Sequence, residues 1–260
     1  MSERDALKAV LANSEIGDKV NGPVPSNVRL GEMTTTGLRV SDGRIYEEVD
    51  DNFRWPQLIH TCKMMSRDET IYAANNAIKA LIRRVKWRVD TPDAHGEKDE
   101  DMLDREKFIW ECMHDMEHSW SDFINEALSM MTYGFSVHEK VYKLRDGYEN
   151  RRKHKSRFSD QKIGWAKLPV RSQDTIYKWR YDSNVRDIQY VQQDLSYALG
   201  STGQPREIDT QVDIPYSKVL HFKFDSQRGN PEGNTPLKAC YVAWKYKCTI
   251  AEFEAIGVSR

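Results

Sequence analysis

The sequence lacks the features that mark secreted and membrane-spanning proteins. Its 4 cysteines, Cys62, Cys112, Cys240 and Cys248, contain no CxxC pair. The first residues, MSERDALKAV, are charged and lack the apolar core of a secretory signal. No run approaches the roughly 18 apolar residues that a membrane-spanning helix needs. We therefore expect a protein that is made in the reducing cytoplasm and has no membrane partner.

The chain also lacks an excess of charge of either sign. Its 39 Lys and Arg residues oppose 40 Asp and Glu residues, which gives a formal net charge of -1. Such a chain has no general electrostatic attraction to nucleic acids or anionic membranes. Its hydrophobic share of 39% is also low, because typical domains have about 45–50% apolar residues. We expect a modest core with polar arms and loops, or surfaces that bind partners.

The common sequence motifs of enzymes are missing. The segment QRGNPEGNTP contains glycines, but it matches neither GxxxxGK[ST] nor GxGxxG, so it does not predict a phosphate-binding loop. The sequence contains no GxSxG motif and no evident Ser, His and Asp set. We expect a protein that is not an enzyme and that binds no cofactor.

Two weaker groups of residues keep an alternative open, a metal-dependent nucleic-acid enzyme. In CMHDMEH, the side chains of His114 and His118 share a helix face near Cys112, but the HExxH spacing of a zinc site is absent. An acidic run comprises Glu97, Asp99, Glu100, Asp101, Asp104 and Glu106. Carboxylates can hold magnesium, but a dense run in a polar connector is more typical of a solvated charge block.

A basic stretch, RRKHKSR, lies in a predicted loop between two strands. Its cations are Arg151, Arg152, Lys153, Lys155 and Arg157. They could contact DNA phosphates or an acidic partner. The alternative is a solvated hairpin tip, because Asp146 and Glu149 lie close by in the sequence.

The first half of the chain has the pattern of an arm followed by helices. Residues 1–55 are rich in Gly, Pro, Ser, Thr and Asn over much of their length and predict an N-terminal arm. From Trp55 the pattern becomes helical, with Pro56 at a first helical position and Asp68 as the cap of a second helix. The segment VKWRVD predicts a short strand. The segment FIWECMHDMEHSWSDFINEALSMM predicts a further helical region.

After Gly134 the apolar period changes to two. FSVHEKVYKL alternates apolar and polar residues and predicts a strand that closes in a turn at Asp146 and Gly147. Further short strands are predicted in KIGWAKLPV, TIYKWRYD, VRDIQYVQQ and KVLHFKFD. Helices followed by strands favour an α+β fold with a mainly antiparallel β region.

The last predicted helix is apolar on two opposite sides. Pro236 can start it, with Thr235 or Asn234 as its cap. At about 100° per residue, one face holds Leu237, Tyr241, Trp244 and Cys248, and the other holds Val242, Tyr246, Ile250, Phe253 and Ile256. A helix on a domain surface has one apolar stripe. This helix is therefore either buried in its own domain or packed between neighbouring subunits, and we expect these nine residues to form a subunit interface.

Several segments together resemble the N-terminal half of a tailed-bacteriophage portal protein of the Mu-like type. These segments are DETIYAANNAIKALIRRVKWRV, EALSMMTYGFSVHEKVYK, LPVRSQDTIYKWRYDSNVRDIQYVQQ, IPYSKVLHF and GNPEGNTPLKACYVAWKYK. They occur in the order that such portals show. The resemblance implies an N-terminal arm at residues 1–55, a wing-like α+β domain at 56–234 and the start of a stem-like helix at 235–260.

The resemblance implies a structural role. It suggests a ring of about twelve subunits at one capsid vertex, the head-to-tail connector through which DNA is packaged and ejected. The expected partners are other copies of the chain, the major capsid protein, the terminase, adaptor or neck proteins and the double-stranded DNA in the channel. The expected location is the virion, after synthesis in the host cytoplasm. A head-completion adaptor or other interaction module is a further alternative.

The length of the chain departs from this resemblance. Such portals continue into a clip, a second stem helix and a crown. The sequence therefore leaves open a split gene whose second polypeptide supplies the C-terminal half, a fragment, or a reduced relative.

Overall fold

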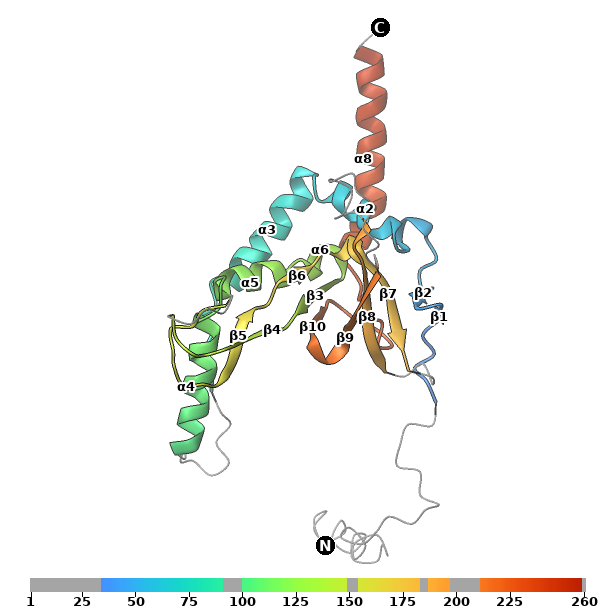
Figure 1. Cartoon of the computed structure of the whole chain (residues 1–260). Coiled ribbons are helices and arrows are strands. Elements are labelled where there is room, and N and C mark those ends of the chain that lie inside the picture. Colours follow the sequence, from blue (N-terminus) through green and yellow to red (C-terminus); the bar gives the residue numbers. More distant parts are fainter. Residues whose placement is uncertain (1–33, 91–99, 149–153, 183–186, 197–210, 259–260) are drawn as a thin grey trace, which may run out of the picture. The chain divides into compact units, whose positions relative to one another are not determined.

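The computed structural model (Figure 1) describes residues 34–90, 100–148, 154–182, 187–196 and 211–258. The chain divides into two compact units, Met1–Thr35 and Thr36–Arg260. The division falls within the predicted arm, whose end at residue 55 stays a prediction. Residues 36–55 belong to the second unit because Ile45 and Phe53 are buried in its core. All elements given below lie in this second unit.

The helices cluster in the middle of the chain, with a long one near its C-terminal end. They are α2 (Gln57–Met65), α3 (Glu69–Arg83), α4 (Glu100–His114), α5 (Trp120–Ala127), α6 (Met130–Tyr133) and α8 (Leu237–Val258). Asp68 caps α3 as expected, since its carboxylate accepts hydrogen bonds from the backbone N–H groups of Thr70 and Ile71. Among the described residues, no helix is both long and apolar enough to cross a membrane.

The strands are short, and those that pair do so antiparallel. They are β1 (Val40–Ser41), β2 (Arg44–Ile45), β3 (Phe135–Glu139), β4 (Val141–Leu144), β5 (Ile163–Lys167), β6 (Val170–Arg171), β7 (Ile176–Tyr181), β8 (Ile188–Asp194), β9 (Gln211–Pro215) and β10 (Val219–Lys223). One sheet has the order β10-β3-β6 and another the order β7-β8-β9, while β1 pairs with β2 and β4 with β5. The predicted α+β class with antiparallel strands is confirmed.

The structure differs from the sequence prediction in several segments. VKWRVD forms no strand; instead the Trp87 ring packs edge-on against Trp120, with centroids 6.4 Å apart. Part of the acidic run is helical, because α4 begins at Glu100. The single strand predicted after Gly134 is two strands, β3 and β4, which pair with different partners. Strand β9 was missed because its sequence, QVDIP, is short and polar and becomes a strand by pairing with β8.

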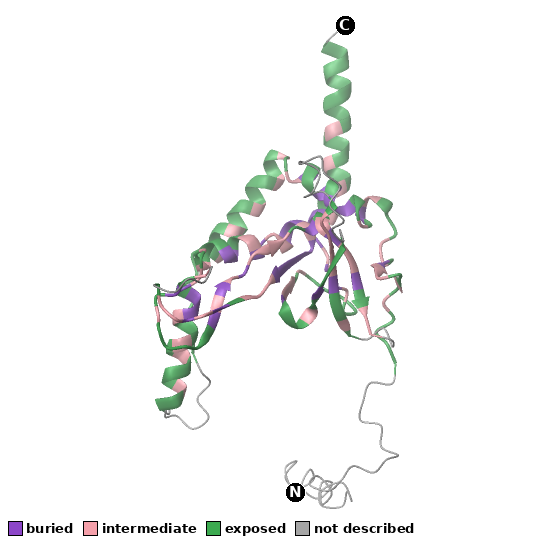
Figure 2. Ribbon diagram, in the orientation of Figure 1, coloured by how far each residue is buried: buried purple, intermediate pink, exposed green. Residues whose placement is uncertain are grey.

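Three apolar clusters form the core of the second unit. The first lies on the sheets and includes Phe135, Trp179 and Val191. The second gathers α2 residues with Phe53 and Leu237, and the third joins α5 to the sheet through residues such as Phe123. Figure 2 shows these buried positions in purple around the middle of the unit, whereas most of α8 is exposed. The second cluster connects the base of α8 to the rest of the fold.

The junction between α6 and β3 fixes where α8 begins. Gly134 adopts φ 93°, a left-handed conformation that L side chains rarely tolerate. Its carbonyl accepts a hydrogen bond from the Phe224 N–H at 2.8 Å, and the Asn234 N–H donates to the Phe224 carbonyl at 2.8 Å. A Cβ at Gly134 would collide with the Glu232 carbonyl. Glycine therefore lets the loop that leads into α8 lie directly on this junction.

We predict that Gly134→Ala destabilises the protein by about 3 kcal/mol or more, because it adds a backbone collision to the strain of a positive φ. Gly229→Ala is the matched control, since Gly229 has φ +73° but no atom within 4 Å of an added Cβ. That variant should lose only about 1 kcal/mol. Urea unfolding of the two variants measures the difference. Equal losses would show that the close approach at Gly134 contributes nothing.

Candidate subunit interface

The base of α8 is held by a buried threonine. The hydroxyl of Thr235 donates to the Thr132 carbonyl at 2.8 Å and accepts from the Leu237 N–H at 3.2 Å. Thr235 therefore caps the helix, as the sequence predicted, and also ties it to α6. Pro236 follows at the position where its missing N–H costs nothing. This arrangement sets the direction in which α8 leaves the core (Figure 1).

The inner face of α8, defined by Leu237, Tyr241, Trp244 and Cys248, packs on its own chain near its base. Leu237 is only 3% exposed and belongs to the cluster with Phe53 and the α2 residues. The Tyr241 ring meets Phe53 edge-on at a centroid distance of 5.0 Å, and the Trp244 side chain packs against the same cluster. These contacts attach the first turns of the helix to α2.

Two lysines add ion pairs on either side of this attachment. Lys247 Nζ lies 2.7 Å from an Asp68 carboxylate oxygen and 3.3 Å from Glu69, at the N-terminal end of α3. Lys238 pairs with Glu48 near the base of the helix. Lys247 is half exposed, so this pair contributes little stability, but it places α3 and α8 side by side at a defined level of the helix.

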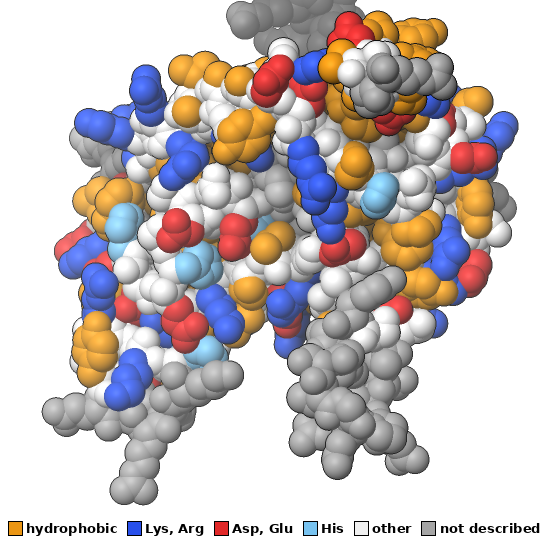
Figure 3. Space-filling view, turned by 90° about the horizontal axis from the view of Figure 1, so that it is seen from above, with side chains coloured by type: hydrophobic (Ala, Val, Ile, Leu, Met, Phe, Trp, Pro, Cys, Tyr) orange, Lys and Arg blue, Asp and Glu red, His pale blue; other side chains and the backbone are white. Residues whose placement is uncertain are grey.

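The outer face of α8, defined by Val242, Tyr246, Ile250, Phe253 and Ile256, is exposed. Its side chains are between 53% and 70% accessible. Every residue from Thr249 to Val258 is exposed as well, so the last ten or so residues contact water all round. Seen from above, hydrophobic side chains (orange) gather around the end of this helix (Figure 3). Contiguous apolar surface of this kind marks an interaction site on a soluble domain.

The structure divides the nine residues predicted at an interface into two groups. Leu237 is buried in the core of its own chain, and a role for it in a subunit contact stays a prediction. Tyr241, Trp244 and Cys248 are half-buried, and the first two pack on the same chain. The five outer-face residues are exposed, and their role in a subunit contact stays a prediction. Helical periodicity gave both faces equal weight because it does not show which one meets the chain's own core.

The loop of the predicted basic stretch is anchored by buried polar contacts. Lys143 and Asp115 form an ion pair at 2.9 Å with side chains only 2% and 3% exposed. The Asp115 carboxylate accepts hydrogen bonds from the Ser156 hydroxyl at 2.6 Å and the Arg157 N–H at 2.9 Å. Lys143 Nζ also donates to the Lys155 carbonyl at 2.8 Å. Burial acts to raise the pKa of Asp115, but these hydrogen bonds and Lys143 outweigh it and lower that pKa.

This anchoring holds two of the predicted contact residues in fixed positions. Lys155 and Arg157 are exposed residues that flank the buried Ser156. Arg151, Arg152 and Lys153 lie outside the described residues. The sequence left open whether this loop between strands contacts DNA or an acidic partner, or is a solvated hairpin tip. Only the structure reveals that Asp115, at the end of α4, fixes this loop.

A comparison with protein families bears on the whole arrangement from α2 to α8. Residues 61–258 match the family described as the portal protein of Mu bacteriophage. This match covers well over half of the 260 residues. The chain belongs to this family. A search of the curated proteins found no match. The matched range ends at the last residue of α8, so the helix with the exposed face lies within the match.

The residues considered for a metal site do not converge in this portal protein. Cys112 is buried on α4 with its Sγ 3.8 Å from Arg145 Nη1. The His114 ring nitrogen Nδ1 interacts with the Trp110 carbonyl at 2.8 Å. Within the part of the chain that the structure describes, no group of three or more His, Cys, Asp or Glu side chains could hold a metal ion. Of the acidic run, Glu97 and Asp99 lie outside the described residues.

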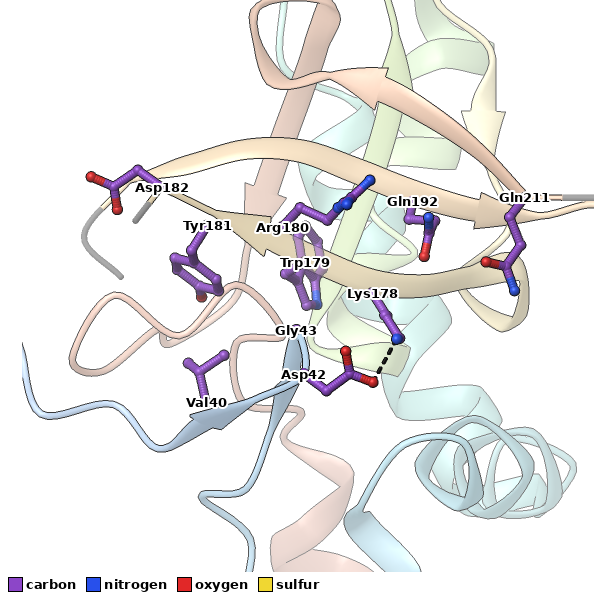
Figure 4. Close-up of a pocket in the computed structure, with 10 residues that line it drawn as sticks. All are labelled: Val40, Asp42, Gly43, Lys178, Trp179, Arg180, Tyr181, Asp182, Gln192 and Gln211. Atoms are coloured by element: carbon purple, nitrogen blue, oxygen red, sulfur yellow. Dashed lines mark hydrogen bonds and ion pairs between the residues drawn. The ribbon is translucent and has the colours of Figure 1, made fainter. Parts of the chain in front are cut away.

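A polar pocket of about 430 Å³ lies between the β1–β2 turn and strands β7 and β8 (Figure 4). Asp42 in the turn pairs with Lys178 of β7 at 2.6 Å. Arg180 and Gln192 both donate to the carboxylate of Asp213. The Asp42–Lys178 pair therefore joins the N-terminal hairpin to the sheet, whereas the contacts of Asp213 connect strands within the sheet. The sequence gave no sign of this pocket.

The side-chain carboxyl of Glu232, which precedes α8 in the chain, has a pKa well above its ordinary value. Burial raises the pKa of Glu232 to about 7, while a hydrogen bond with Trp179 acts in the opposite direction. Lys238 and Glu48 also face this carboxyl. Nearby, His221 stacks on Trp179 at 4.9 Å, and burial lowers its pKa to about 4. Sequence reasoning missed both groups because their burial results from contacts between distant segments.

We predict that replacing Leu237 and Phe253 separates the two faces of α8. Leu237→Ala should lower the free energy of unfolding of the single chain by about 2–4 kcal/mol, because it leaves a cavity in the core. Phe253→Ala should change it by about 0.5 kcal/mol or less, because the side chain is 70% exposed. Urea unfolding at low protein concentration measures both values. A large loss from Phe253→Ala in the monomer would contradict an exposed outer face.

We predict that Glu232→Gln stabilises the protein at pH 8 by about 1–3 kcal/mol. The folded state raises the pKa of Glu232 from 4.5 to about 7. Stability linked to this group is therefore fully present below pH 4.5 and is lost as pH rises through 7. The pKa of His221 is lowered from 6.5 to about 4, so the stability linked to this group changes with pH in the opposite direction. Because His221 is present in both proteins, the difference in stability between wild type and variant reports on Glu232.

Melting temperatures measured from pH 5 to pH 8.5 test this prediction. The gap between Glu232→Gln and wild type should widen as pH rises. Glu254→Gln, at an exposed position on α8, removes the same charge and should show no widening. A constant gap for Glu232→Gln would mean that this carboxyl is solvated.

Proposed function

We propose that the chain is a structural subunit of a phage portal, a ring of about twelve copies at one capsid vertex through which DNA is packaged and ejected. The family match supports a portal protein. The observation that carries the ring assignment is the outer face of α8, whose apolar side chains are exposed in the single chain. An exposed apolar surface of this kind favours aggregation unless a partner covers it.

The two faces of α8 support a heterologous contact, in which two different surfaces meet. The inner face is attached to its own chain at the base, and the outer face points elsewhere. Contacts of this type close into rings when the rotation between copies is suitable. We assign residues 56–234 to a wing-like domain, on which residues 36–55 pack, and residues 235–260 to the start of a stem-like helix that packs between neighbouring copies.

The charge of the chain supports a conduit that lets DNA slide. Its formal net charge is -1, so it does not neutralise many phosphates, and tight neutralisation would hold DNA in place. Lys155 and Arg157, on their anchored loop, are our candidates for contact with DNA or with an acidic partner protein. The further partners that follow from a portal role are the major capsid protein, the terminase and the adaptor proteins, in the virion.

The native mass of the assembly in phage particles tests this proposal. We expect a ring of about twelve copies in DNA-free precursor heads as well as in filled heads, because a packaging conduit is needed before DNA enters. Mass spectrometry of the isolated ring also identifies any second polypeptide that belongs to it. Phe253→Ala should weaken assembly while the monomer still folds.

Three results would contradict the proposal. A chain that remains monomeric in particles is not a ring subunit. A ring that joins only DNA-filled heads would identify a head-completion adaptor instead of a portal. Cleavage of DNA by the purified, metal-supplied protein would favour the enzyme alternative.

A further inference from the structure

An apolar notch lies where the N-terminal end of α3 meets α8. Its volume is about 280 Å³, and it is lined by Asp68, Thr70, Ile71, Cys240, Ala243, Trp244 and Lys247. The walls are mainly apolar, and Ile71, Ala243 and Trp244 contribute to them. The Asp68–Lys247 ion pair forms its rim. The notch is open in the single chain and has room for one or two side chains.

The notch and the outer face occupy the same level of α8 on different sides. Cys240, Ala243 and Lys247 line the notch, and Val242 and Tyr246 alternate with them along the sequence. At about 100° per residue, the two sets lie roughly 120° apart around the helix. Val242 and Tyr246 are 61% and 67% exposed, so both surfaces are accessible in the single chain.

The charges around the two surfaces are complementary. At the notch, Lys247 forms ion pairs with two carboxylates, those of Asp68 and Glu69, and the Glu69 side chain is 86% exposed. One negative charge is therefore in excess at the rim. On the other side, Lys245 lies next to Tyr246 and one turn after Val242. A copy that presents Val242 and Tyr246 to the notch would bring this lysine toward Glu69.

We propose that the notch receives Val242 and Tyr246 from α8 of the adjacent copy, a contact that rests on the ring proposed above. Rotation about the ring axis keeps every residue at its height when the helices run along that axis, so surfaces at the same level meet. Because the notch and the outer face are different surfaces, the contact is heterologous and repeats from copy to copy. The notch thereby sets the register between neighbouring helices.

Disulfide trapping tests this pairing with a cysteine that the protein already has. Cys240 is an exposed free cysteine in the notch, whereas Cys62 and Cys112 are buried. In a Cys248→Ser background, Val242→Cys should cross-link the assembled protein on mild oxidation and give a ladder of multimers on a non-reducing gel, because positions 240 and 242 differ in height by only about 3 Å. A bond within one chain is excluded because the side chains at these two positions point about 160° apart around the helix.

Two controls define the result. Adding Cys240→Ser should abolish the ladder. Phe253→Cys lies on the same outer face but about 16 Å further along the helix than Val242→Cys, so it should leave the chains uncross-linked. The oligomer before oxidation is measured by native mass in every variant.

The outcomes separate the two proposals. Absence of any oligomer would overturn the ring itself. An oligomer that gives no ladder through Val242→Cys, with or without one through Phe253→Cys, would leave the ring intact and overturn the notch pairing. A ladder that depends on both Cys240 and Val242→Cys, without one from Phe253→Cys, establishes it.

Discussion

The backbone of the loop before α8 lies directly on the junction between α6 and β3, and the placement of the long helix depends on this contact. Gly134 turns the chain from helix to strand with φ 93°. Its carbonyl bonds the Phe224 N–H, and no side chain separates it from residues 232–234. The Thr235 hydroxyl then donates a hydrogen bond to the Thr132 carbonyl in α6. A helix held in this way at its base can present the rest of its length to partners.

This attachment divides α8 into a part that stabilises its own chain and a part available to others. The Leu237 side chain stabilises the fold of its own chain by packing in the core with Phe53 and α2. From Thr249 onward the helix is exposed on all sides, and an isolated helical segment of that length is marginal in water. Membership of the Mu portal family gives a physical reason for the exposure, since a neighbouring copy would supply the missing contacts. The notch beside Trp244 is the surface that we assign to that copy.

Local patterns in the sequence were sufficient for several elements. Asp68 was recognisable as a helix cap because its side chain and the following turn lie next to each other in the chain. The alternation after Gly134 predicted strands for the same reason, although it did not reveal that β3 and β4 pair with different partners. Strand β9 and the buried pair of Lys143 and Asp115 were not predictable, since each depends on a partner that is distant in sequence.

The sequence by itself determined the α+β class, the start of α8 and the two apolar faces of that helix, because these follow from periodicity, caps and composition. The tertiary structure alone decided which face belongs to the core. It buried Leu237 against residues about 180 positions away and left Tyr246 and Phe253 in water. The same long-range packing placed Asp68 beside Lys247 and gave Glu232 surroundings that raise its pKa. Burial is a property of how distant segments meet, so a helical pattern alone could not assign it.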